Sequence, residues 1–254
     1  MSGEVATLFF VAVLGGALNA VAGGGTFLTF PALLFARIPP IIANATASVA
    51  LWPASAASAF AYRKDLTTPR PTLVALLIAS VVGAFIGVMT LLHTSDAAFM
   101  RLVPFLLLAA TLLFTFGGAI SARLLKRSTA SPLTGRTLAL GVAAQSLIAI
   151  YGGYFGAGMG ILMLSMMSLV GMTNIHGMNA LRNILSVLIN AVAVTVFVAS
   201  GSIAWKPGVV MIIGGIIGGY WGAAGARRLD PKWVKRFVIA VAWSMTAYFF
   251  VRAR

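Results

Sequence analysis

The sequence predicts an all-α, polytopic membrane protein of two inverted repeats, each a glycine-broken helical hairpin followed by three transmembrane helices. Three observations lead to this fold class: a very apolar composition, six apolar runs of membrane-spanning length, and two longer apolar runs interrupted by glycine. Of the 254 residues, 60% are hydrophobic and only 9% are charged, whereas a soluble domain carries about 25% charged residues. A chain this apolar is expected to reside in a lipid bilayer.

Six apolar runs have about the 20 residues that a helix needs to cross the hydrocarbon core. Pro53 and Pro104 fall inside two of these runs, where neighbouring helices of a membrane bundle tolerate a kink. We therefore expect six ordinary transmembrane helices, at residues 41–62, 72–92, 99–120, 179–199, 207–226 and 234–251.

Two further apolar runs, residues 5–36 and 137–170, are too long for one ordinary span. Both contain glycines, which destabilise a helix interior, so each run is expected to be two helical arms joined by an irregular turn. The second arms are expected to start near Thr26 and Ile161. Irregular backbone at membrane depth persists only where it is buried in protein or lines a wet cavity, so both turns are candidate sites.

The two halves of the chain match at a constant offset of 135 positions, without a gap. An ungapped series of matches indicates a duplicated unit, although each match alone is weak in a glycine-rich chain. We expect a first repeat at residues 1–122, a cytoplasmic linker at 123–136 and a second repeat at 137–254. The matches are Gly23 with Gly158, Gly25 with Gly160, Asn44 with Asn179, Gly83 with Gly218, Gly87 with Gly222 and Arg101 with Arg236.

The eighteen lysines and arginines test the topology. If the chain simply crossed the membrane eight times, ten bases would lie on one side and eight on the other. If each glycine-broken run instead dips in and returns, the halves are inverted, and thirteen bases lie on one side and five on the other. The positive-inside rule favours the second arrangement, with the linker in the cytoplasm, although Arg252 and Arg254 then lie outside.

Several function classes are disfavoured by the composition. A net charge of +14 can indicate nucleic-acid binding, but these bases lie in short loops between apolar runs, so no nucleic-acid partner is expected. No catalytic set, metal-ligand cluster or phosphate-binding loop can be assembled, and the chain has no cysteine. We expect no enzyme activity, no cofactor and no metal. The expected partners are a small anionic substrate and membrane lipid, and a homodimer remains an open alternative to a monomer.

Inverted repeats with broken helices place a binding site near the bilayer midplane, where the two breaks meet. A helix that starts there presents unpaired N–H groups and a partial positive charge, which together suit an anion. The alternative is that the glycines only allow helices to cross closely. The expected substrate-binding residues are Gly23, Gly24, Gly25, Thr26, Asn44, Gly158, Gly160, Ile161, Asn179, Arg182 and Asn190.

Arg182 stands one turn after Asn179, where the first half has Ala47. Its guanidinium can bind an oxyanion through two parallel hydrogen bonds, or it can extend to the membrane interface. Asn44 and Asn179 are expected either to donate to the anion or to cap a helix N-terminus. Asn190 lies deep in a span, where it contacts either a ligand or a neighbouring helix.

No carboxylate lies in the middle of a predicted span. Proton and sodium relays in membranes usually use such groups, so coupled import by that route is disfavoured. With a negative cell interior, each anionic charge that leaves gains about 2.3 kcal/mol per 100 mV. The charge pattern is therefore more compatible with export.

At residues 16–31 and 153–160, and again at Asn179 to Arg182 and at Asn190, the chain resembles the TauE/SafE sulfite exporter family, also called the 4-toluene sulfonate uptake permease family. The resemblance covers nearly the whole chain. It implies a multi-pass permease of the bacterial inner membrane for sulfite, organosulfonates or related oxyanions. We expect a secondary transporter that exports such an anion; the alternatives are an anion channel and a non-transporting membrane scaffold subunit.

Overall fold

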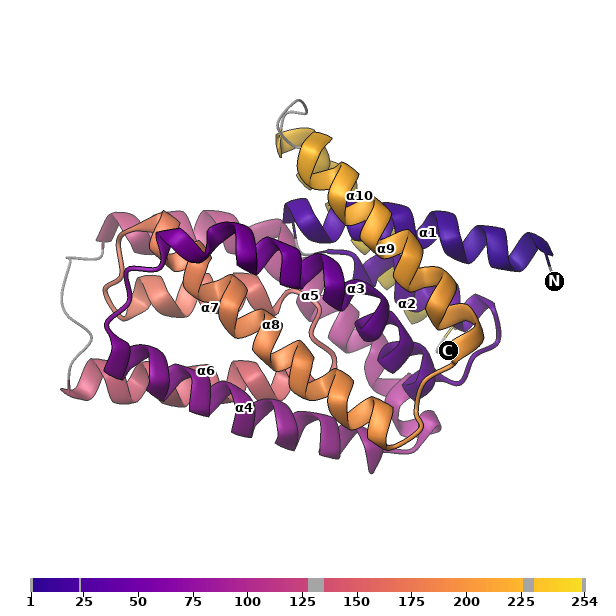
Figure 1. The fold of residues 1–254 in the computed structure, drawn as a ribbon, viewed down its shortest axis with the longest axis horizontal. Helices are drawn as coiled ribbons and strands as arrows, with labels where there is room; N and C mark the ends of the chain where they lie inside the picture. Colours follow the sequence, from indigo (N-terminus) through magenta and orange to yellow (C-terminus); the bar gives the residue numbers. More distant parts are fainter. Residues whose placement is uncertain (1, 23, 128–134, 226–230, 253–254) are drawn as a thin grey trace.

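A computed structural model describes residues 2–22, 24–127, 135–225 and 231–252 (Figure 1). Over these ranges the chain is helical and contains no β-strand, which confirms the all-α prediction. The elements are α1 (Ser2–Ala22), α2 (Thr26–Phe35), α3 (Pro40–Tyr62), the 3₁₀ turn η1 (Arg63–Asp65), α4 (Arg70–Leu92), α5 (Asp96–Arg127), α6 (Gly135–Tyr154), α7 (Met159–Leu169), α8 (Ile175–Ala199), α9 (Trp205–Gly225) and α10 (Pro231–Arg252).

The six predicted transmembrane helices correspond to α3, α4, α5, α8, α9 and α10. Proline stands at or near the start of several of them: Pro40 opens α3, Pro231 opens α10, and Pro71 is the second residue of α4. Proline suits this place because the first N–H groups of a helix have no partner within the helix. Helix α5 continues to Arg127, into the segment predicted as linker.

The outside of the bundle is apolar. Among the described residues, four helices have the length and hydropathy of a membrane span, namely α4, the Asp96–Gly117 part of α5, α6 and α8. Large apolar side chains such as Phe105, Leu147 and Trp221 are more than half exposed. Soluble monomers rarely expose extended apolar surface, so this exterior is suited to lipid.

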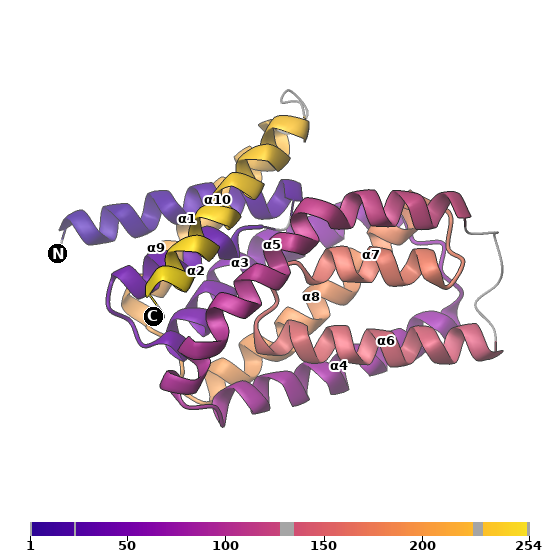
Figure 2. The same ribbon diagram turned by 180° about the vertical axis from the view of Figure 1, so that it is seen from behind.

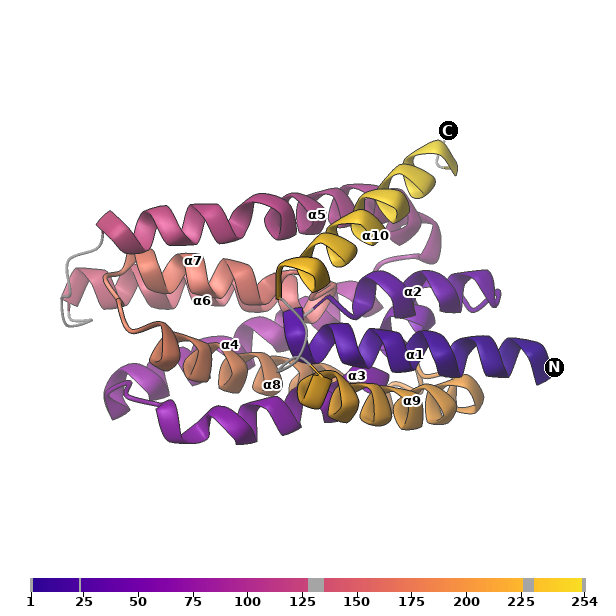
Figure 3. The ribbon, with the colours of Figure 1, turned by 90° about the horizontal axis from the view of Figure 1, so that it is seen from above.

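Both glycine-broken runs form helical hairpins. Helices α1 and α2 run in opposite directions and pack against each other, as do α6 and α7 (Figure 3). The start of α1 and the end of α10 lie toward one end of the elongated molecule, and the end of α5 and the start of α6 lie at the other (Figure 2). Each hairpin turns back toward the end of the molecule from which it came.

The hairpins exchange partners between the two halves of the chain. Helix α1 packs along α9, and α6 packs along α4. Both interfaces need glycine, because a Cβ on Gly16 would overlap the backbone of Gly215 and a Cβ on Gly153 would overlap the backbone of Ala84. Each hairpin is therefore buried against a helix from the other half.

The glycine contacts of α4 and α9 do not follow the offset of 135. Gly218 of α9 approaches the backbone of Val13 as Gly87 of α4 approaches that of Ile150, whereas the constant offset pairs Gly218 with Gly83. The helix starts themselves keep the offset, because α4 starts at Arg70 and α9 at Trp205. The difference therefore concerns which glycines meet the neighbouring backbone, and not the positions at which the helices start.

The offset of 135 does hold where α3 meets α8 and where α5 meets α10. The hydroxyls of Thr111 and Thr246 form a hydrogen bond of 2.9 Å deep in the bundle, and these residues are 135 positions apart. The indole N–H of Trp52 donates to the carbonyl oxygen of Val187 over 3.3 Å, again 135 positions away. Contact between equivalent residues is what a two-fold relation between two units produces on its axis.

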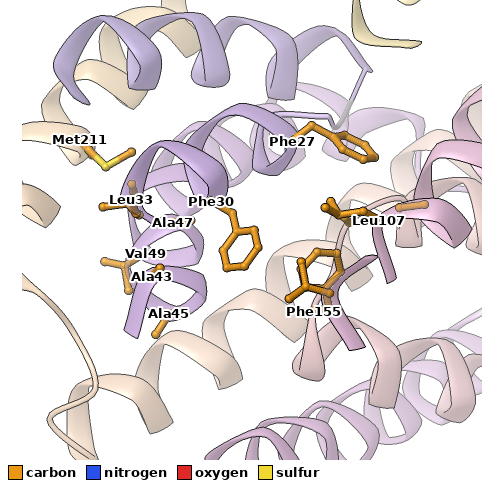
Figure 4. Packing of buried hydrophobic residues seen from close by; sticks show 14 of the residues in the cluster. Phe27, Phe30, Leu33, Ala43, Ala45, Ala47, Val49, Leu107, Phe155 and Met211 are labelled. Atoms are coloured by element: carbon orange, nitrogen blue, oxygen red, sulfur yellow. The ribbon is translucent and has the colours of Figure 1, made fainter. Parts of the chain in front are cut away.

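Two hydrophobic clusters fill the interior. One, the phenylalanine cluster, surrounds α2 (Figure 4). The other, the methionine cluster, surrounds α7. The phenylalanine cluster contains Phe27, Phe30, Phe99, Phe114, Phe155 and Phe249, and the methionine cluster contains Met159, Met163, Met166, Met167 and Met178.

Candidate functional site

The turn between α6 and α7 is built on positive backbone angles. Gly156 and Gly158 have φ values of +79° and +78°, a conformation that glycine adopts at little cost. The phenol O–H of Tyr151 donates to the carbonyl oxygen of Ala157 over 2.6 Å and fixes the middle of the turn. Helix α7 then starts at Met159, two residues before the predicted start at Ile161, because Gly158 is its N-cap.

One backbone donor remains at the start of α7. The N–H groups of Met159 and Ile161 donate to the carbonyl oxygens of Gly156 and Gly158. The N–H of Gly160 has no hydrogen-bond partner among the residues that the structure describes. A donor of this kind at a helix N-terminus is suited to an anion.

Arg182 reaches this helix start from α8. A Cβ built on Gly160 would lie 3.3 Å from Cδ, 3.8 Å from Nε and 3.7 Å from Nη1 of the arginine, so the side chain rests against Gly160. Its Nη2 donates to Oδ1 of Asn183 over 2.8 Å. Arg182 is half-buried, and its side chain lies against α7.

The turn between α1 and α2 is built differently. Its N-cap, Gly25, has ordinary helical angles, and α2 starts at Thr26 as predicted. Glycine is required here for space, because a Cβ on Gly25 would overlap the carbonyl oxygen of Gly15. Gly24 is buried, Thr26 is half-buried, and Gly23 lies outside the described residues.

The two breaks lie against the same stretch of α5. A Cβ on Gly24 would meet the Phe114 ring at 3.4 Å, and one on Gly158 would meet Ala110 at 3.6 Å, one helical turn away. The rings of Phe30 and Phe155, one from each hairpin, make an edge contact with centroids 5.7 Å apart (Figure 4). The predicted proximity of the breaks is present, and between them lie phenylalanine rings.

The predicted asparagines lie within helices, and neither Asn44 nor Asn179 is a cap. The N-cap positions are Pro39 for α3 and Asn174 for α8, and the Asn174 side chain accepts from two backbone N–H groups. Asn44 is buried, and its amide donates to the carbonyl oxygen of Tyr154 at the end of α6 over 3.2 Å. Asn44 therefore joins α3 to the second break.

The remaining predicted residues line α8. Asn179 and Asn190 are both half-buried on the helix that carries Arg182. The N-cap alternative for Asn44 and Asn179 is wrong because a proline and an earlier asparagine occupy the helix starts.

Sequence reasoning missed two residues at the second break, Tyr151 and Asn183. Asn183 is 8% exposed, although it is polar and lies in a span. A buried polar residue beside an arginine within an apolar run was the available signal. Tyr151 carried none, because an isolated tyrosine in an apolar helix usually serves only packing.

Acidic groups stay away from this site. Among the described residues, Glu4, Asp65 and Asp96 lie in the first turn of a helix or in η1, and no cluster of histidine, aspartate and glutamate that could hold a metal ion is found there. The charge nearest the start of α7 is thus the Arg182 guanidinium, and the arrangement suits an oxyanion.

The chain is similar to known membrane transporter proteins. The family model for the sulfite exporter TauE/SafE matches residues 8–249. The chain is 29% identical to a probable membrane transporter protein of Haemophilus influenzae, covering 96% of this chain and 93% of the relative. It is 28% identical to a probable membrane transporter protein, ORF9, of a Sinorhizobium species, over 94% of this chain and 89% of that one.

A third relative is the probable membrane transporter protein YfcA of Escherichia coli K12, 26% identical over 94% of this chain and 87% of the relative. No solved structure matches the chain significantly. The family match spans almost all ten helices, including both glycine-broken hairpins. The chain belongs to the sulfite exporter TauE/SafE family of membrane transporters.

Proposed function

We propose that the protein is a secondary transporter that moves a small sulfur-containing anion, sulfite or an organosulfonate, out of the cytoplasm across the bacterial inner membrane. The observation that carries this proposal is the Arg182 side chain resting on Gly160, whose N–H has no partner among the described residues. A guanidinium and a helix N-terminus both favour an oxyanion. Membership of a sulfite exporter family supports the choice of sulfur chemistry.

In this proposal the anion binds at the start of α7. Gly158, Gly160 and Ile161 form the helix start, and Arg182 compensates the charge. Asn179 and Asn190 line the approach along α8. The first break, with Gly24, Gly25 and Thr26, borders the site across the phenylalanine rings. Asn44 joins α3 to the second break.

We further propose that residues 1–122 and 137–254 are inverted repeats. The Thr111–Thr246 and Trp52–Val187 contacts support a two-fold relation. The hairpins that return toward their own end support three full crossings in each half, an odd number, which inverts the second half. The thirteen bases on one side put that side, with the linker, in the cytoplasm.

Export follows from the charges. Without a carboxylate in the middle of a span among the described residues, this part of the chain has no side chain of the usual kind for coupling to protons or sodium ions. The membrane potential then drives an anion outward by about 2.3 kcal/mol per charge per 100 mV.

If the protein works by alternating access, each of its two moving rigid bodies must contain helices from both repeats. Rocking one repeat against the other would separate α1 from α9 and α4 from α6, which are close-packed through glycine. One body is therefore proposed to contain α1, α2, α3 and α9, and the other α4, α6, α7 and α8. They meet where α3 crosses α8.

The test is sulfite flux in proteoliposomes. Replacing Arg182 by alanine should raise the sulfite concentration needed for half-maximal flux by at least about tenfold, because a hydrogen bond to a charged group contributes about 1.5–3 kcal/mol. Arg182→Lys should retain part of the affinity because it keeps the charge. Arg136→Ala, at an exposed position on α6, is the matched control and should leave flux unchanged.

The same preparation separates the alternatives. Saturable flux with counterflow supports a carrier, whereas non-saturable flux without counterflow would indicate an anion channel. Unchanged sulfite flux in Arg182→Ala and in Gly160→Leu would contradict the proposed site. Absence of flux for sulfite and organosulfonates in the wild type would favour a scaffold subunit.

A further inference from the structure

Asn183 and Arg182 are neighbours in sequence, yet their side chains are hydrogen-bonded. Adjacent residues of a helix point about 100° apart and do not normally face each other. The 2.8 Å bond from Nη2 to Oδ1 therefore requires the arginine side chain to fold across the surface of α8 toward Asn183. This fold directs the guanidinium to α7 rather than along its own helix.

The second restraint on the guanidinium comes from α7. The Cδ, Nε and Nη1 atoms of Arg182 lie where a side chain on residue 160 would stand, between 3.3 and 3.8 Å from a Cβ built there. Glycine at 160 leaves that space to the arginine. The guanidinium is thus held between an amide oxygen on one helix and a bare backbone on another.

The chemistry of Asn183 matters as much as its position. Its side chain is 8% exposed, so its oxygen acts in an environment where a hydrogen bond is stronger than in water. The amide is neutral, so it orients the guanidinium without cancelling the positive charge. A carboxylate at the same place would form an ion pair with Arg182 and compete with any anionic ligand.

We propose that Asn183 is a positioning residue that, together with Gly160, sets the orientation of the Arg182 guanidinium and thereby the affinity for the anion. This inference rests on the proposed function of Arg182. In this inference Asn183, which is buried and neutral, influences the affinity for the anion without touching it.

The experiment measures sulfite counterflow and sulfite-induced thermal stabilisation of the purified protein for Asn183→Asp, Asn183→Ala and Gly160→Ala. Asn183→Asp should abolish stabilisation by sulfite, because its carboxylate would pair with Arg182, while the melting temperature without sulfite stays close to that of the wild type. Asn183→Ala should raise KM about tenfold with kcat changed less, because the charge remains but its orientation is lost. Gly160→Ala should raise KM less, because it displaces the arginine by only a few tenths of an ångström.

Two variants serve as matched controls. Asn174→Asp adds the same charge to the same helix at its exposed N-cap, where aspartate caps equally well. Gly141→Ala adds a methyl group on α6, where the contacts are ordinary, at 3.6 Å or more. Both should retain wild-type KM.

The outcomes distinguish this inference from the proposed function. If Arg182→Ala retains wild-type sulfite affinity, the proposed site itself fails. If Arg182→Ala loses affinity while Asn183→Asp and Gly160→Ala keep wild-type KM, the positioning role is overturned and the transporter proposal stands. Should the Asn183 variants not fold, Gly160→Ala with wild-type KM overturns the inference and with raised KM supports it.

Discussion

The two hairpins share a shape but differ in what surrounds them. Around α2 the buried side chains are mainly phenylalanine and alanine, whereas around α7 they are mainly methionine and leucine. Phenylalanine rings meet edge to face at defined angles, as Phe27 and Phe114 do with centroids 5.4 Å apart. Methionine is flexible and adapts to irregular space.

The difference indicates a division of labour between the halves. The first break is closed by rigid rings, and where the second half has Arg182 the first has Ala47, which is fully buried. The second break has glycines at positive φ, an arginine and an adaptable lining. We therefore expect substrate contact and movement at α7, with α2 serving as the fixed wall.

The largest loss of stability is expected when a side chain is removed from the phenylalanine cluster. Phe30 contacts the rings of Phe99, Phe155 and Phe249, so Phe30→Ala should destabilise the protein by about 3–5 kcal/mol. Unfolding in mixed micelles measures the change. Phe116→Ala, at an exposed position on α5, is the control, and an equal loss in both variants would refute the rigid-wall interpretation.

The next largest loss of stability is expected when a glycine at a close helix contact is replaced. The loss should be similar in the α1–α9 and the α4–α6 interfaces. Gly218→Ala forces α9 away from α1, and Gly87→Ala forces α4 away from α6, each at a cost of about 1–3 kcal/mol from overpacking. The melting temperature of each variant, compared with that of Gly141→Ala, gives the result. A large loss in one interface alone would show that the two are not equivalent.

A smaller change is expected in the methionine cluster. Met163→Leu keeps the volume of a fully buried side chain, so stability should fall by less than about 1.5 kcal/mol. Sulfite turnover should nevertheless fall, because leucine lacks the flexibility of the thioether chain. Paired unfolding and counterflow measurements separate the two effects, and wild-type turnover would remove methionine adaptability from the mechanism.

The smallest loss of stability is expected when the hydrogen bond between Thr111 and Thr246 is removed. Thr111→Val and Thr246→Val each remove one partner of the same hydrogen bond, and such bonds in membrane bundles average about 0.6 kcal/mol. The two single variants should lose similar stability, and the double variant should lose less than their sum. Additive losses in this cycle would mean that the two hydroxyls act independently.

Much of the fold could be predicted from local pattern. Run length predicted the helices α3, α4, α5, α8, α9 and α10, of which α4, α5 and α8 have the length and hydropathy of a membrane span in the described residues. Interrupted runs predicted both hairpins, because glycine weakens a helix. Arg182 was found because a single charge stands out in an apolar run. These signals are local in sequence.

The features that could not be predicted depend on which segments, distant in sequence, contact each other in the fold. Nothing in residues 5–36 states that α1 packs on α9, because glycine allows close approach to any helix. Helix α7 starts at Met159 rather than Ile161 because Gly158 adopts a positive φ. Gly156, Gly158 and Gly160 could each adopt such an angle, so the sequence does not indicate which of them precedes the helix. Asn183 acquires its role only once Arg182 folds across α8.

Because each hairpin packs against a helix from the other half of the chain, its packing partner can be synthesised much later than the hairpin itself. Helix α1 is made first, but its partner α9 begins only at Trp205, which is roughly 10–40 s later at about 5–20 residues per second. Until then the glycine face of α1 has no protein surface to close on. A nascent chain released before α9 is complete therefore lacks the main packing partner of its first helix.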